Sequence, residues 1–267
     1  MSLMLNRAYA ALWRAFGDEG IARPGYVQSI PDNLLPEIEF RKIREELEQG
    51  AGNELNAKFL AVHSSTALVV NSFGIFKSDQ CSTQFEWNGD KFAPPQFERQ
   101  CRTGLGGTPP NIDVWFSASD AVVAIESKLT EYFTPKQAFF ADSYTRENLP
   151  YAEDCWWTIL EDSKDAGKRY LDVAQLVKHY LGLRRHMCDG GAGRIELLYV
   201  FWEPANANQL DCCVQHREEI SALIDAVSGS AVTLAAISYS DLWRDWDSTP
   251  ALKTHVANLR ARYDVEI

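Results

Sequence analysis

The sequence has no stretch of eighteen or more apolar residues, so no membrane-spanning helix is expected. Its first residues, MSLMLNRAYAALW, lack the basic start, apolar centre and small-residue cleavage site of a secretory signal. The six cysteines show no CxxC spacing, which argues against structural zinc. Reduced thiols in a cytoplasm of bacterial type are therefore the expectation.

Several motifs of common hydrolases and nucleotide-binding proteins are also missing. The five histidines show no HxH or HExxH spacing, and no serine lies in a GxSxG elbow. The glycine-rich stretch TGLGGTPP lacks the Gly-Lys-Ser/Thr ending of a phosphate-binding loop. These absences argue against histidine–zinc hydrolysis, serine hydrolysis and a P-loop, and favour TGLGGTPP as a flexible segment that admits substrate.

Positive charge is scarce, with 26 basic residues against 37 acidic ones and a net charge of −11. Such a chain is not expected to coat nucleic acid non-specifically. A nucleic-acid enzyme stays open, because it needs positive potential only along its substrate groove. Between Lys164 and Arg194 basic residues outnumber acidic ones by seven to three. Lys178, Arg184 and Arg185 are therefore candidate phosphate contacts, and a solvated helix face is the alternative.

The order of apolar patterns predicts an α/β fold, with a mixed central sheet flanked by helices. An antiparallel meander is expected at residues 97–101, 112–117 and 121–128, and the apolar run 195–202 is expected beside it. We assign residues 1–267 to one domain, with an N-terminal helical extension (1–50) and an aromatic-rich insertion (130–163). The aromatic residues of this insertion either stack nucleic-acid bases or form auxiliary core, and core is favoured. Helices are expected at residues 36–50, 53–73, 165–187 and 208–227, and from residue 250 onward.

The stretch NIDVWFSASDAVVAIESKL, residues 111–129, combines a hairpin pattern with buried charge. Its second strand, AVVAIESKL, is apolar except for Glu126, Ser127 and Lys128. Residues two apart on a strand point to the same side, so Glu126 and Lys128 project together. The hairpin brings Asp113 close to Glu126 across the ladder.

Two carboxylates and a lysine at a strand end form a site suited to a hard cation. Mg²⁺ prefers a few carboxylates together with waters and phosphate oxygens. A lysine beside it can orient the attacking water or stabilise the charge of a phosphoryl transition state. The alternative is a simple salt bridge in solvent at the end of a strand.

Asp113 in NIDVWF, with Glu126 and Lys128 in VVAIESK, resembles the PD-(D/E)xK nuclease superfamily, which has the restriction-endonuclease-like fold. The resemblance covers about residues 50–240, through the motif and the order of elements. It implies that Asp113 and Glu126 bind Mg²⁺ or Mn²⁺ and that Lys128 assists the attacking water. Ile112 stands where the family motif has proline, a variation found in the family.

Two further residues follow from the same resemblance. Many members add a metal-binding carboxylate from the helix before the meander, and Glu54 in GNELNAKFL is the matching position. A role in favouring the helix N-terminus is the alternative for Glu54. Some members carry a Gln-Tyr motif on the helix after the lysine. Gln175 in AQLVKHY is the weaker match, since Tyr180 lies one residue too far along.

The sequence thus predicts a cytoplasmic, metal-dependent nuclease that acts on nucleic acid, with DNA favoured, and that has no membrane partner. The alternative is a catalytically silent member of the same fold that binds nucleic acid or protein. The choice of DNA or RNA, the recognition sequence and a homodimeric state stay open.

Overall fold

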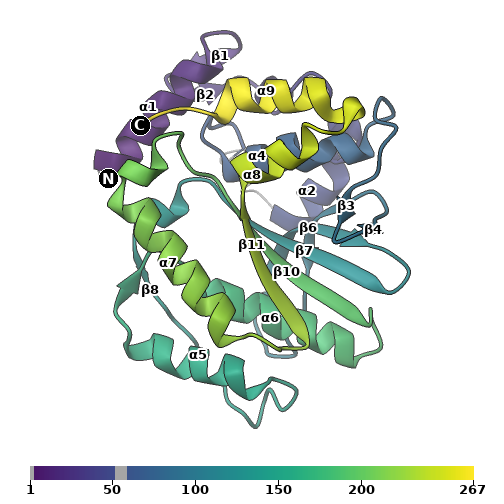
Figure 1. Cartoon of the computed structure of the whole chain (residues 1–267), viewed down its shortest axis with the longest axis vertical. Helices are drawn as coiled ribbons and strands as arrows, with labels where there is room; N and C mark the ends of the chain where they lie inside the picture. Colours follow the sequence, from purple (N-terminus) through teal and green to yellow (C-terminus); the bar gives the residue numbers. More distant parts are fainter. Residues whose placement is uncertain (1–2, 52–58) are drawn as a thin grey trace.

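The computed structural model describes residues 3–51 and 59–267. At its centre lies a five-stranded sheet with the order β11-β10-β7-β6-β5 (Figure 1). β5, β6 and β7 form an antiparallel meander, while β10 runs parallel to both β7 and β11. The predicted mixed α/β sheet is therefore confirmed. Within the described residues, no helix is long and apolar enough to cross a membrane.

The strands of this sheet are β5 (Gln96–Gln100), β6 (Asn111–Ser117), β7 (Ala121–Lys128), β10 (Arg194–Phe201) and β11 (Val232–Ser238). Three short two-stranded antiparallel sheets lie outside it among the described residues: β1 (Ile21–Arg23) with β2 (Tyr26–Val27), β3 (Glu86–Trp87) with β4 (Asp90–Lys91), and β8 (Lys136–Gln137) with β9 (Lys168–Arg169). The α-helices are α1 (Leu3–Phe16), α2 (Arg44–Ala51), α4 (Ser65–Phe73), α5 (Asp154–Asp165), α6 (Val173–Cys188), α7 (Asp211–Ala226), α8 (Tyr239–Trp246) and α9 (Lys253–Tyr263). Short 3-10 turns cover Pro31–Asn33, Phe40–Lys42, Gly74–Lys77, Glu131–Phe133, Ala207–Gln209 and Pro250–Leu252.

Both faces of the sheet are covered by helices, so every residue of β7 is buried. Val123 and Ile125 face a core shared with α1, α4, α8 and α9. Val122 and Ala124 face a second core shared with α5, α6 and part of α7. This two-sided burial explains why β7 reads as a continuous apolar run, and why charges on it need a special reason.

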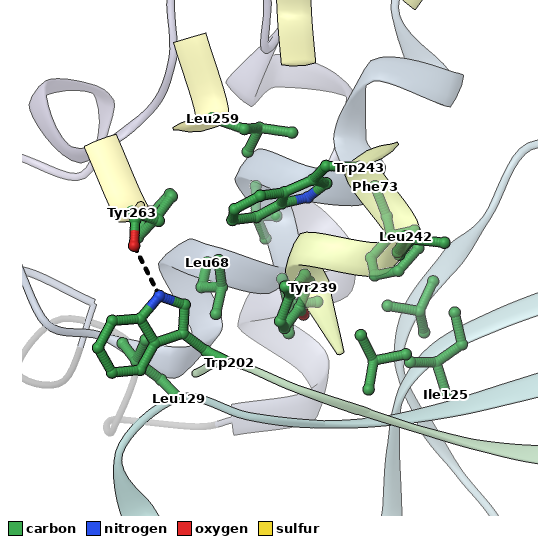
Figure 2. Packing of buried hydrophobic residues seen from close by; sticks show 14 of the residues in the cluster. Leu68, Phe73, Ile125, Leu129, Trp202, Tyr239, Leu242, Trp243, Leu259 and Tyr263 are labelled. Atoms are coloured by element: carbon green, nitrogen blue, oxygen red, sulfur yellow. Dashed lines mark hydrogen bonds between the residues drawn. The ribbon is translucent and has the colours of Figure 1, made fainter. Parts of the chain in front are cut away.

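The first of these cores also holds the end of the chain in place. Trp202, directly after β10, is fully buried and donates its indole N–H to the Tyr263 carbonyl over 2.7 Å (Figure 2). Tyr239 and Trp243 of α8 pack in the same core. The Tyr239 hydroxyl lies 2.7 Å from the Ser127 hydroxyl, so α8 is tied directly to the charged end of β7.

Three expected helices differ at their starts, although residues 53–58 of the expected helix 53–73 lie outside the described residues. Residues 59–64 are not helical, and α4 begins at Ser65, where the Ser64 side chain caps it by accepting the Ala67 N–H. α6 begins at Val173 because Asp172 caps it, and residues 168–169 form a strand instead. In the stretch 36–50, the α-helix starts only at Arg44.

The aromatic insertion at 130–163 is mainly core, as favoured from the sequence. Tyr132, Phe133 and Trp156 are buried. Tyr132 and Phe133 belong to the first core, and Trp156 belongs to the second. Phe139 is the exception, with 73% of its surface exposed.

Candidate active site

The site begins where β6 and β7 separate. The two strands pair from Ser117↔Val122 to Val114↔Ile125, and Asp113 is the next residue of β6. Instead of continuing the ladder, Asp113 accepts the Ser127 N–H on its side-chain Oδ2 over 2.7 Å. At this position a side-chain carboxylate, and not a backbone carbonyl, accepts the amide of the neighbouring strand.

The neighbouring strand is irregular at the same level. β5 pairs with β6 at Phe97↔Val114 and Arg99↔Ile112, and Glu98 lies between these pairs with φ of +53°. A positive φ is uncommon for a residue other than glycine and marks local strain. The irregularity places a third carboxylate, Glu98, in the electrostatic surroundings of Asp113.

Glu126 and Lys128 project together from the end of β7, as their spacing predicts. Lys128 Nζ donates to Glu126 Oε1, and it also donates to Gln175 Oε1 on α6 over 2.8 Å. The other Glu126 oxygen lies 2.7 Å from His179 Nε2, at an angle outside hydrogen-bond geometry. Gln175 and His179 reach the pair together because they lie one helical turn apart on α6.

These contacts keep a charged pair stable in a buried place. Glu126 is fully buried and Lys128 is 8% exposed. Burial would raise the pKa of Glu126, but Lys128 and His179 together lower it to about 2. Burial would lower the pKa of Lys128, but the Glu126 carboxylate raises it above its usual value. Both groups are therefore charged at neutral pH.

The pKa of Asp113 is shifted in the opposite direction to that of Glu126. Its partial burial raises its pKa well above the usual range, and the negative charge of Glu126 raises it further. Without an added positive charge, Asp113 is the carboxyl of the site that holds a proton most readily.

The comparison with protein families gives one match over almost the whole chain. The family described as "Restriction Endonuclease associating with ARP" matches residues 7–264. The chain belongs to this family. Comparison with curated proteins and with solved structures gives no match. The family match and the mixed sheet together support a restriction-endonuclease-like domain, and the matched range contains Asp113, Glu126 and Lys128.

The donor atoms of this family member suit a hard cation such as Mg²⁺. Asp113 and Glu126 offer carboxylate oxygens, and Asp113 Oδ1 has no hydrogen-bond partner among the described residues. In residues 3–51 and 59–267, no group of three or more His, Cys, Asp or Glu side chains could hold a metal ion. Two carboxylates still fit Mg²⁺, because this ion keeps several waters or takes phosphate oxygens.

Four of the predicted site residues come together in the structure, namely Asp113, Glu126, Lys128 and Gln175. Glu54, the candidate third metal ligand, lies outside the described residues. The three basic residues of α6 have different surroundings. Lys178 lies over the Phe140 ring at 5.7 Å, and Arg184 lies 4.0 Å from the Glu153 carboxylate. Arg185 faces the β5–β6 loop.

Two residues at the site were not among the predicted site residues. His179 could have been found from its i, i+4 spacing to Gln175 on α6. Glu98 has no such signal, because its place beside Asp113 depends on a backbone bend in β5.

Proposed function

We propose that this chain is a metal-dependent nuclease that hydrolyses phosphodiester bonds in DNA, through a site of the PD-(D/E)xK type. The observation that carries the proposal is the buried Glu126–Lys128 pair beside Asp113, at the point where β6 and β7 separate. A buried ion pair adds little to stability compared with apolar side chains of the same size. Its presence in an otherwise apolar strand is therefore better explained by chemistry.

Each residue has a role that follows from its contacts. Asp113 and Glu126 would hold the cation, which would lower the pKa of a bound water and neutralise charge on the phosphate. Lys128 provides a fixed positive charge for the phosphorane-like transition state. Gln175 holds the Lys128 ammonium in place from α6, and His179 supports the far oxygen of Glu126.

A second candidate function is a catalytically silent binding module with the same fold. Both Glu126 oxygens already have close partners in Lys128 and His179, which favours this alternative. The net charge of −11 also favours it over an enzyme that must bind a polyanion. The two functions differ in metal binding, because only the nuclease needs a cation at Asp113 and Glu126.

The test combines metal calorimetry with single-turnover cleavage of single- and double-stranded DNA and RNA, in Mg²⁺ or Mn²⁺. Glu126→Gln should weaken metal binding and abolish cleavage. Lys128→Met should leave metal binding largely intact, yet lower the cleavage rate on the order of 10²- to 10³-fold. Its unbranched side chain keeps most of the packing of lysine.

Lys77→Met is the matched control. Lys77 is also a largely buried lysine paired with a glutamate, Glu46, but that pair lies outside the site. The control should cleave at the parent rate. If Lys128→Met also cleaves at the parent rate, the Glu126–Lys128 pair is only a structural salt bridge. Absence of metal binding by the parent would favour the silent module.

A further inference from the structure

The loop between β5 and β6 forms a pocket that the proposed chemistry does not use. Residues 101–110 and the C-terminal half of α6 enclose about 650 Å³. This volume lies within the range of about 300–1,000 Å³ that is usual for ligand sites. Arg102, Gly104, Gly106 and Gly107 on its wall are exposed, so the pocket opens to solvent.

Two glycines allow the loop to lie directly against α6. At Gly182 of α6, a Cβ would come within 2.5 Å of the Cys101 carbonyl oxygen. At Gly104, which has φ of +89°, a Cβ would overlap the Arg185 guanidinium. The Tyr151 hydroxyl donates to the Thr103 carbonyl and holds the loop from the other side. The pocket is therefore a built feature, with a defined position for Arg185.

The charge of the pocket is opposite to that of the whole molecule. Arg99, Arg102 and Arg185 line it, and among the described residues Asp189 is the one acidic side chain on its wall. The Arg99 Cζ lies over the Trp115 ring, 3.9 Å from its centroid, and Arg185 lies 3.4 Å from Asp189. Over the described part of the chain, Arg99 and Arg102 pair with no carboxylate. Guanidinium groups with unused donors match phosphate oxygens well.

We propose that this pocket binds the phosphodiester backbone of the substrate strand at a fixed distance from the cleaved bond. The proposal rests on the proposed nuclease function. Gln175 marks the catalytic end of α6, and Arg185 lies ten residues further along the same helix. At 1.5 Å per residue this is about 15 Å, or about four nucleotides of one strand of B-DNA. The pocket would thus hold the strand while Asp113, Glu126 and Lys128 act on a phosphate several nucleotides away.

The test measures binding without cleavage. A labelled DNA duplex and the matching single strand are titrated in the absence of metal, at several salt concentrations between about 50 and 200 mM. The double variant Arg102→Gln, Arg185→Gln should raise Kd on the order of 10- to 50-fold at about 0.1 M salt. It should also reduce the slope of log K against log salt by about 0.7–0.9 for each phosphate that the variant no longer binds.

The matched control is Arg244→Gln, Arg260→Gln, which removes the same charge from α8 and α9 on the opposite face of the sheet (Figure 1). It should keep the parent slope. An unchanged slope in the Arg102, Arg185 variant would overturn the proposal. A second result would also overturn it. In that result, a mononucleotide or inorganic phosphate binds the parent but not the Arg102, Arg185 variant, while the slope for DNA is the same in both proteins. That result would assign the pocket to a free phosphate compound.

The same data separate this inference from the proposed function. If the parent binds DNA, cleaves nothing, and has a smaller slope in the double variant, the pocket proposal stands and the nuclease proposal fails. If the parent cleaves but the slope is unchanged, the nuclease proposal stands and the pocket proposal fails. If the parent binds no nucleic acid at all, both are wrong.

Discussion

Glu126 is a carboxylate with no exposed surface, held between the ammonium of Lys128 and the imidazole of His179. A buried ion pair of this kind adds little to the stability of the fold compared with apolar side chains of the same size. The side chains that surround it are therefore expected to tune its position and that of Lys128, more than the stability of the fold.

A substitution of Gln175 tests whether the surrounding side chains position Lys128. Its Oε1 accepts a hydrogen bond from Lys128 Nζ over 2.8 Å, so Gln175→Ala frees the ammonium to move. We expect the single-turnover rate to fall on the order of 10- to 100-fold, with little change in the unfolding midpoint. An unchanged rate in a folded variant would show that Glu126 alone positions Lys128.

His216 gives a pH-dependent prediction away from the site. Burial lowers its pKa from 6.5 to about 3, and its Nε2 lies 2.9 Å from the Tyr199 hydroxyl. The folded state therefore keeps His216 neutral, while the unfolded state takes up a proton below pH 6.5. Its stabilising effect is full above pH 6.5, and is lost as the pH falls toward 3.

The variant His216→Gln should remove this dependence. Between pH 6.5 and 3, the free energy of unfolding should fall less steeply than in the parent, by up to about 1.4 kcal/mol per pH unit. Urea unfolding at several pH values measures the two slopes. Equal slopes would mean that His216 is protonated in the folded protein.

Among the elements, α6 carries both the side chains that contact Lys128 and Glu126 and one wall of the basic pocket. Gly182 lies between these two parts and contacts the start of the β5–β6 loop. In a free helix Gly→Ala is stabilising by about 1 kcal/mol. Here the added methyl would meet the Cys101 carbonyl, so Gly182→Ala should destabilise the protein by about 1–3 kcal/mol in urea unfolding.

A substitution on another helix serves as the control for Gly182→Ala. Ser221→Ala changes an exposed position of α7 and should alter stability by less than about 0.5 kcal/mol. If Gly182→Ala is as stable as the parent or more stable, the loop is free to move away from α6.

The meander and the strand beside it could be predicted from the sequence, because two-sided burial gives long apolar runs such as AVVAIESK and RIELLYVF. Helix starts were less predictable. The sequence patterns place the starts of two helices too early. In the structure, α4 begins at Ser65, after the N-cap Ser64, and α6 begins at Val173, after the N-cap Asp172. Local patterns favour a helix there, and a single capping hydrogen bond decides where it begins.

The site was predictable to the extent that it lies on regular structure. The spacing of Glu126 and Lys128 on β7, and the placing of Asp113 on the paired strand, follow from the alternation of a hairpin. The place of Glu98 does not, because it depends on a positive φ in a residue that does not usually adopt one. The basic pocket also depends on close approach of two segments distant in the sequence.

For the whole molecule, the proposed cation links the site to stability. Any ligand that binds only the folded state stabilises it. A free ligand concentration of about ten times the Kd adds about 1.4 kcal/mol to the free energy of unfolding. For a chain of 267 residues this corresponds to a rise in Tm of about 2–4 °C. Mg²⁺ or Mn²⁺ should therefore raise the Tm of the parent in thermal unfolding.

Glu126→Gln should show no such rise, while Lys77→Met should respond like the parent. Na⁺ at equal ionic strength controls for general screening by salt. A rise that persists in Glu126→Gln would place the cation elsewhere in the molecule.

The hydrogen bond from the Ser127 N–H to Asp113 has a practical consequence for spectroscopy. A backbone amide that is bound to a carboxylate has a chemical shift that follows the charge on that carboxylate. In a nitrogen-15 spectrum, the Ser127 signal becomes a single-atom indicator of what Asp113 holds. Titration with metal, or addition of DNA, could then be followed at one resonance in the intact protein, without any label on the substrate.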